Sequence, residues 1–123
     1  MAVLNDLIVY RLASELRLAV ITLTDGPRAV AEYRLRDQLR AAAGSVVANI
    51  AEGYGRAQHN DFARFLDHAS GSLRETEEWL RDGIARRTWS AADAEPSLRL
   101  AIRLTPALTR LKRYLRNSKT PSF

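Results

Sequence analysis

The sequence predicts an all-α protein that folds as an antiparallel, up-down four-helix bundle. Four stretches repeat apolar residues at intervals of three and four, which is the spacing of one face of a helix. Short segments with glycine, proline or a capping residue separate them, so each connection returns the chain alongside the previous helix. The 123 residues are enough for one domain with a single core. We assign residues 1–116 to the bundle and residues 117–123, which have no periodicity, to a disordered C-terminal tail.

The first two helices are expected at residues 6–23 and at about 30–52. The glycine and proline within residues 24–27 end the first pattern, because proline cannot continue it. Gly44 lies inside the second helix and costs about 1 kcal/mol relative to alanine, which a close approach of another helix would offset. The expected core-facing residues of these helices are Val9, Ala13, Leu16, Val20, Leu23, Leu35, Leu39, Val46 and Ile50.

The turn into the third helix contains Gly53 and Gly55, which are expected to supply the backbone freedom of a C-cap. Asn60 is predicted to be the N-cap of the third helix, which ends within residues 82–87. The apolar residues of this helix form a heptad seam, which marks the side turned to the core. The seam consists of Phe62, Leu66, Ala69, Leu73, Thr76 and Leu80.

Ser90 is predicted to cap the fourth helix, which continues to residue 116. Pro106 removes one backbone hydrogen bond and is expected to kink this helix rather than end it, since the apolar pattern resumes in phase. The core face of the fourth helix is expected to consist of Ala101, Leu104, Leu108, Leu111 and Leu115.

A narrow polar arc follows the second helix. At about 100° per residue, Ser45, Asn49, Glu52 and Arg56 project on nearly the same side, together with Gln38. Short side chains such as Ser and Asn are unusual on a solvated face, so two interpretations stay open. The arc is either a polar helix edge with an i,i+4 pair between Glu52 and Arg56, or a hydrogen-bonded network in a crevice of the bundle or a subunit contact.

Positive charge gathers toward the end of the chain. The formal net charge is +5, and only two of the 19 cationic residues are lysine. After Glu95 there is no acidic residue, while Arg99, Arg103, Arg110 and Arg113 share the side of the fourth helix opposite its leucines. A solvated face normally mixes charges of both signs, so this stripe indicates an anionic partner such as the backbone of RNA or DNA.

The arginines are also consistent with two simpler origins. The stripe could offset acidic faces on neighbouring helices or subunits, and the high arginine content could reflect the codons of a GC-rich genome. If the stripe binds nucleic acid, Tyr114 is the only aromatic residue near it. Base stacking is therefore expected to add little, and sequence preference to be slight.

Residues that carry catalysis or hold metals are sparse. The chain has no cysteine, which excludes disulfides and thiolate chemistry. A di-iron site needs Glu-x-x-His pairs on facing helices, but His59 follows Arg56 by three residues and His68 follows Phe65. We expect His59 in a loop before the third helix and His68 on the surface of that helix. We therefore expect no enzyme activity, metal or cofactor, and, because no apolar stretch could span a membrane, a cytoplasmic location without membrane contact.

Two segments carry a family resemblance: SVVANIAEGYGR at residues 45–56 and DFARFLDHASGSLRETEEWL at residues 61–80. They resemble the bacterial 23S rRNA intervening-sequence proteins, also called four-helix-bundle proteins, whose pattern runs roughly S-x-P-A-N-I-A-E-G-x-G-R and then D-F-x-R-F-L-x-x-A-x-G-S-L-x-E. The N-terminal LNDLIVYRLASEL is similar to the family's opening helix, with Tyr10 where tryptophan is usual. Val47 stands where the family has proline, and Ala41 where a second arginine is frequent.

The resemblance implies a four-helix bundle that assembles into rings, typically pentamers. It also implies a relation to the accessory proteins of diversity-generating retroelements, which bind nucleic acid and a reverse transcriptase. We therefore expect a non-catalytic homo-oligomer that binds RNA or DNA, with a reverse transcriptase as a further partner. The small residues at positions 70–72 would let the backbone of another subunit approach. The alternative is a protein-interaction module, an accessory subunit whose arginines meet an acidic protein partner and which has no role with nucleic acid.

Overall fold

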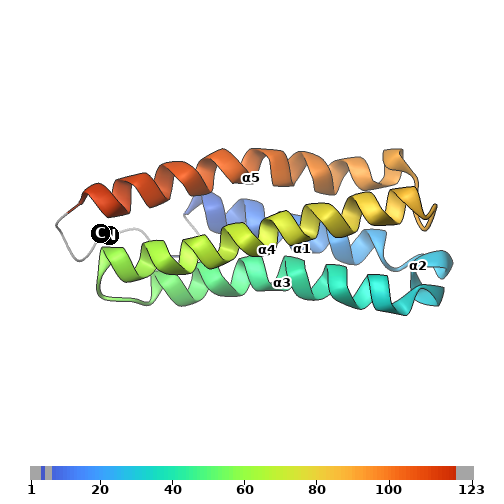
Figure 1. Ribbon diagram of the computed structural model, residues 1–123, viewed down its shortest axis with the longest axis horizontal. Coiled ribbons are helices and arrows are strands. Elements are labelled where there is room, and N and C mark those ends of the chain that lie inside the picture. Colours follow the sequence, from blue (N-terminus) through green and yellow to red (C-terminus); the bar gives the residue numbers. More distant parts are fainter. Residues whose placement is uncertain (1–3, 5–6, 119–123) are drawn as a thin grey trace.

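In the computed structural model, which describes Leu4 and residues 7–118, every regular element of the described chain is helical. The predicted all-α class is confirmed. The four long helices lie alongside one another, with the short helix α2 at one end (Figure 1). The elements are α1 (Ile8–Leu23), α2 (Pro27–Ala31), α3 (Tyr33–Tyr54), α4 (His59–Ala85) and α5 (Ala91–Asn117).

One apolar core runs between the long helices. Helix α3 packs against α4, α4 against α5, α5 against α1, and α1 against α3. Every residue of the seam predicted on α4 is buried. The predicted core residues of the other helices are buried too, except Leu23 and Leu111, which lie half-buried against the core. Burying a leucine contributes roughly 1.5–3 kcal/mol, so this shared core is what holds the helices together.

The predicted start of the second helix is wrong. Instead of one helix from about residue 30, the structure has the separate helix α2 and then, after a non-helical Glu32, the long helix α3. Pro27 opens α2 at its first position, where the missing N–H has no helical partner to lose and the fixed φ suits the helix. The proline that ends the first apolar pattern therefore also begins a short helix.

Two arginines of α3 hold the turn that follows α1. Arg36 Nε donates to the carbonyl oxygen of Thr24 at 3.1 Å, and Arg40 Nε donates to Thr24 Oγ1 at 2.7 Å. A second nitrogen of Arg40 donates to Asp25 Oδ1 at 2.8 Å. The buried Thr24 hydroxyl in turn donates to the carbonyl oxygen of Val20 at 2.7 Å. These two arginines are therefore engaged in holding the fold.

The connection between α3 and α4 agrees with the prediction only in part. Gly55 is the C-cap of α3, as expected, although its φ of −76° is one that any residue can adopt. Gly53 lies inside α3, which runs on to Tyr54, and its φ is not in the left-handed region. A β-carbon at Gly53 would lie 2.7 Å from the ring of Phe62, so this glycine makes room for a packed ring. Helix α4 begins at His59, and the preceding residue makes no side-chain capping bond. The predicted Asn60 cap is therefore wrong.

His59 is buried in the first turn of α4, with 5% of its surface exposed, so its predicted loop position is wrong. Its ring centroid lies 6.0 Å from that of Tyr114 on α5, at an interplanar angle of 45°. The first turn of α4 therefore packs against the last turns of α5. His68 is exposed on α4, as predicted, and its ring meets Phe65 edge-on at 6.0 Å.

Trp89 closes the connection between α4 and α5. It is 6% exposed, and its indole nitrogen donates to the carbonyl oxygen of Leu80 at 3.0 Å. The indole lies directly against Gly83, where a β-carbon would fall 2.7 Å from the indole nitrogen and closer still to the ring carbons. Arg87 makes the turn with a φ of 62°, in the left-handed region. Gly83 is thus a helical residue whose missing side chain admits the tryptophan.

Helix α5 begins and continues as the sequence predicts. Ser90 Oγ accepts a hydrogen bond from the backbone N–H of Asp93 at 3.0 Å, which confirms the predicted cap. The helix runs through Pro106 without ending there, also as predicted. It reaches Asn117, one residue into the predicted tail, and residues 119–123 of that tail lie outside the described residues.

Gly44 lies next to open space in the part of the chain that the structure describes. Nothing lies within 4 Å of a β-carbon built there, and the same holds at Gly71. Among the described residues, no other helix therefore approaches Gly44 closely enough to offset its cost in the helix. A subunit contact at the small residues 70–72 stays a prediction.

Candidate nucleic-acid interface

The four arginines predicted to form one face lie on the outer side of α5. Arg99, Arg103, Arg110 and Arg113 are all exposed, while the leucines on the other side of the helix are buried or half-buried. This division follows from the helical period, because burying the apolar stripe turns the residues half a turn away toward solvent.

The four arginines differ in their partners. Arg99 forms an ion pair with Glu95, one turn earlier on α5. For Arg103, Arg110 and Arg113, no carboxylate of the described residues lies within 4 Å of the guanidinium group. Three uncompensated positive charges therefore follow the outer side of α5, which is the arrangement that favours binding of an anion.

Two further cations of α5 form ion pairs with a carboxylate of α4. Lys112 Nζ lies 3.4 Å from Asp67 Oδ1 on α4 and donates to Ser70 Oγ at 3.0 Å, and Arg116 donates to Asp67 Oδ2. The hydrogen bond from Arg116 is the main cause that holds the pKa of Asp67 below its ordinary value, with the charges of Arg116 and Lys112 adding to it and partial burial opposing it. These pairs tie the last turns of α5 to α4. Both cations belong to the run of positive charge after Glu95, and nothing local in the sequence shows that Asp67 faces them.

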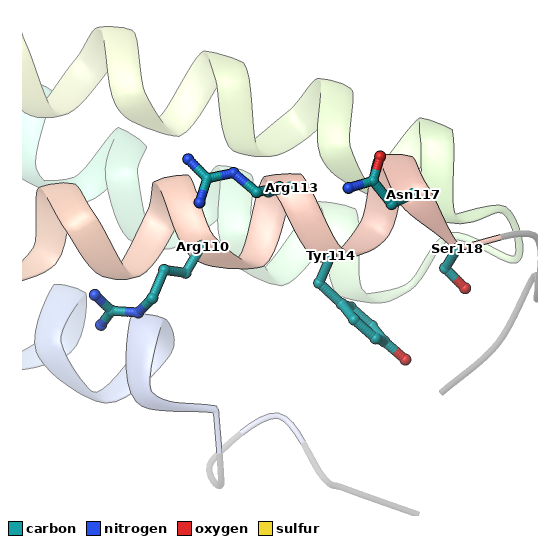
Figure 2. A pocket seen from close by; sticks show the side chains of 5 residues that line it. All are labelled: Arg110, Arg113, Tyr114, Asn117 and Ser118. Atoms are coloured by element: carbon teal, nitrogen blue, oxygen red, sulfur yellow. The ribbon is translucent and has the colours of Figure 1, made fainter.

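A shallow hollow lies at the C-terminal end of the stripe (Figure 2). Arg110 and Tyr114 project from the side of α5 nearer to α1, and Arg113 and Asn117 lie on the adjacent row of the same helix. Ser118, directly after the helix, completes the lining. The sequence predicts that base stacking on Tyr114 adds little to binding. The structure brings its ring into one surface with two of the uncompensated arginines.

The inner half of the predicted polar arc joins two helices. Ser45 Oγ of α3 lies 2.8 Å from Ser72 Oγ of α4, within hydrogen-bonding distance. Asn49 Nδ2 donates to the carbonyl oxygen of Ser45 at 2.9 Å and to its hydroxyl at 3.1 Å. These partly buried groups satisfy one another between α3 and α4, as the network interpretation predicts.

The outer half of the arc is exposed. Arg56 donates to Glu52 Oε1 at 2.8 Å, the i,i+4 pair of the polar-edge interpretation. The guanidinium of Arg56 also lies 4.6 Å from the ring centroid of Phe65 and 3.7 Å from Asp61 Oδ2. Each interpretation therefore describes half of the arc, and Gln38 is exposed apart from both.

Clusters of metal ligands and membrane-spanning helices are both lacking in the described part of the chain. Its residues hold no group of three or more His, Cys, Asp or Glu side chains that could bind a metal ion. Among the same residues, no helix is both long and apolar enough to cross a membrane.

These features define a small all-helical protein with an arginine-rich outer face. The family model of the 23S rRNA-intervening sequence protein matches residues 5–110, so the chain belongs to that family and the resemblance seen in the sequence is confirmed. No curated protein matches the chain. The match includes Arg99, Arg103 and Arg110 and stops before Arg113 and Tyr114, so the distal part of the hollow lies beyond the family model.

Proposed function

We propose that this protein is a non-catalytic, cytoplasmic, oligomeric protein that binds RNA or DNA through phosphate contacts on the outer side of α5. We further propose that its long helices form an antiparallel, up-down four-helix bundle. The observation that supports the binding function is the set of three exposed arginines, Arg103, Arg110 and Arg113, without a carboxylate of the described chain beside them.

The expected binding energy comes from release of condensed counterions. Each phosphate that an arginine neutralises lowers the slope of log K against log salt by about 0.9 for duplex DNA and about 0.7 for single strands. Three contacts per chain therefore give a slope of roughly −2 to −3. Between 50 and 200 mM salt, affinity should fall about 20- to 40-fold per chain.

Oligomerisation would multiply this modest affinity. Stripes on several subunits can engage one strand at high effective concentration, which raises avidity without any new contact. The family resemblance favours a pentamer, and the open surface beside Gly71 has room for a second subunit. A reverse transcriptase stays a proposed partner through the resemblance to retroelement accessory proteins.

The test is binding of fluorescent RNA and DNA oligonucleotides at low salt, followed by anisotropy. The double substitution Arg103→Glu and Arg110→Glu should weaken every oligonucleotide alike, because phosphate contacts carry no sequence information. The matched control reverses two exposed arginines, Arg28 in α2 and Arg34 in the first turn of α3, and should change affinity little. Helix α2 lies at the end of the molecule away from the C-terminal end of α5 (Figure 1). If the wild type binds no nucleic acid at low salt, the proposal fails and the arginine stripe fits an acidic protein partner instead.

A further inference from the structure

We propose that the hollow at the end of α5 is a nucleotide site for single-stranded nucleic acid, in which an unpaired base stacks on Tyr114 while Arg110 and Arg113 hold the adjoining phosphates. This inference rests on the proposed function and adds to it the form of nucleic acid that is bound. It also replaces the expectation that base stacking contributes little.

The placement of Tyr114 carries the inference. The residue is 52% exposed, although it lies on a helix whose opposite side is buried in the core. Arg110 precedes it by one turn on the same row of the helix, a rise of about 6 Å, and Arg113 is its immediate neighbour in the chain. In Figure 2 both guanidinium groups point away from the ring, that of Arg113 back along α5 and that of Arg110 toward α1. A phosphate at the arginines and its base at the ring can therefore be bound together.

The tyrosine is also held in position before any ligand binds. Its ring packs at 6.0 Å against the ring of buried His59, which belongs to α4. On the opposite flank of the helix, Asp67 pairs with Lys112 and Arg116 and fixes the last turns of α5 to α4. A ring that is already oriented loses little conformational freedom on binding, which favours affinity.

The rest of the lining suits a nucleotide. The amide of Asn117 can both donate and accept hydrogen bonds, so it can meet the edge of a base. Every base has a π-face, so stacking on tyrosine tolerates any sequence. A duplex keeps its bases stacked inside and offers only its phosphates to this surface. The hollow should therefore bind single strands more tightly than duplexes of the same sequence.

The experiment compares a labelled single strand with its duplex by anisotropy at low salt. Tyr114→Ala should weaken single-strand binding about 5- to 150-fold, the range measured for removal of one stacking aromatic residue. It should leave duplex binding within about twofold and keep the salt slope, because no charge is removed. Tyr114→Phe should bind like the wild type. Tyr33→Ala is the matched control, since Tyr33, the first residue of α3, is an exposed tyrosine with Arg34 beside its ring.

Tyr114→Leu guards against a folding defect, because leucine retains apolar bulk against His59 but has no π-face. It should lose single-strand affinity as Tyr114→Ala does while keeping the wild-type circular dichroism and melting temperature. The inference is overturned, with the proposed function intact, if binding is salt-dependent but Tyr114→Leu binds single strands as the wild type does. It is equally overturned if the wild type binds duplex as tightly as single strand. Absence of binding to any nucleic acid at low salt overturns the proposed function itself.

Discussion

Gly83→Ala should destabilise the protein, although alanine is the better helix former. In an open helix position the change would stabilise by about 1 kcal/mol. At Gly83, however, the new methyl group would overlap the indole of Trp89, a rigid and buried ring that cannot shift without leaving its place. Displacing a buried tryptophan costs about 3–5 kcal/mol, and its hydrogen bond to the carbonyl oxygen of Leu80 contributes about 1 kcal/mol. The gain in helix propensity offsets the loss of the hydrogen bond, so we expect a net loss of about 3–5 kcal/mol.

The assay is urea denaturation followed by circular dichroism and tryptophan fluorescence, with Gly44→Ala as the matched control. Both glycines lie inside helices, but a β-carbon at Gly44 meets nothing within 4 Å. Gly44→Ala should therefore stabilise by about 1 kcal/mol. If Gly83→Ala proves as stable as the wild type or more so, the close packing of Trp89 on α4 is refuted.

Three further predictions concern the core, the α4–α5 ion pairs and assembly. Leu73→Ala should lower the free energy of unfolding by about 2–5 kcal/mol, since Leu73 is 2% exposed in the α4 seam; an unchanged urea midpoint would place this residue outside the core. The folded pKa of Asp67 lies below its unfolded value of about 3.9, so its carboxylate stabilises the fold above that pH and the contribution is lost as the pH falls below it. Asp67→Asn should therefore melt lower than the wild type at pH 7, by a small margin because the Asp67 side chain is 46% exposed, and the difference should shrink at pH 3. Light scattering at micromolar concentration should give a mass of several chains; a monomer mass would contradict the proposed oligomer.

The apolar spacing predicted most of the fold because the apolar residues of each helix mark the side of that helix that is buried. The residues of the α4 seam and the leucines of α5 face the core as their intervals of three and four require. Helix α2 escaped prediction, because five residues are too few to show a helical period.

The glycines show why the remaining features could not be read locally. A glycine in a sequence suggests backbone freedom, yet Gly53 and Gly83 lie within helices and have no positive φ. Glycine is needed there because a β-carbon would overlap the ring of Phe62 or of Trp89. The space left by a helical glycine is filled by a side chain from another part of the chain. The tertiary contacts determine which side chain this is, and the spacing of residues along one helix does not reveal it.

The sequence predicted the candidate site only in outline, because local spacing shows which side of a helix is charged but not what that side contacts. The one-signed face of α5 follows from the helical period, and the exposure of its arginines agrees with that prediction. The burial of His59 and the pairing of Asp67 with two cations depend on contacts between α4 and α5. These contacts decide which charges remain uncompensated and hold Tyr114 at the surface, so the hollow could be found only in the structure.

The measurement that tests the central claim most directly is the salt dependence of nucleic-acid binding as the uncompensated arginines are neutralised in turn. Arg103→Gln, then Arg110→Gln, then Arg113→Gln should each flatten the slope of log K against log salt by about 0.7–0.9 per chain, because each substitution removes one phosphate contact. Arg99→Gln is the control and should change the slope least, since Arg99 is paired with Glu95. A slope that stays constant through all three substitutions would show that the outer side of α5 does not bind the phosphates.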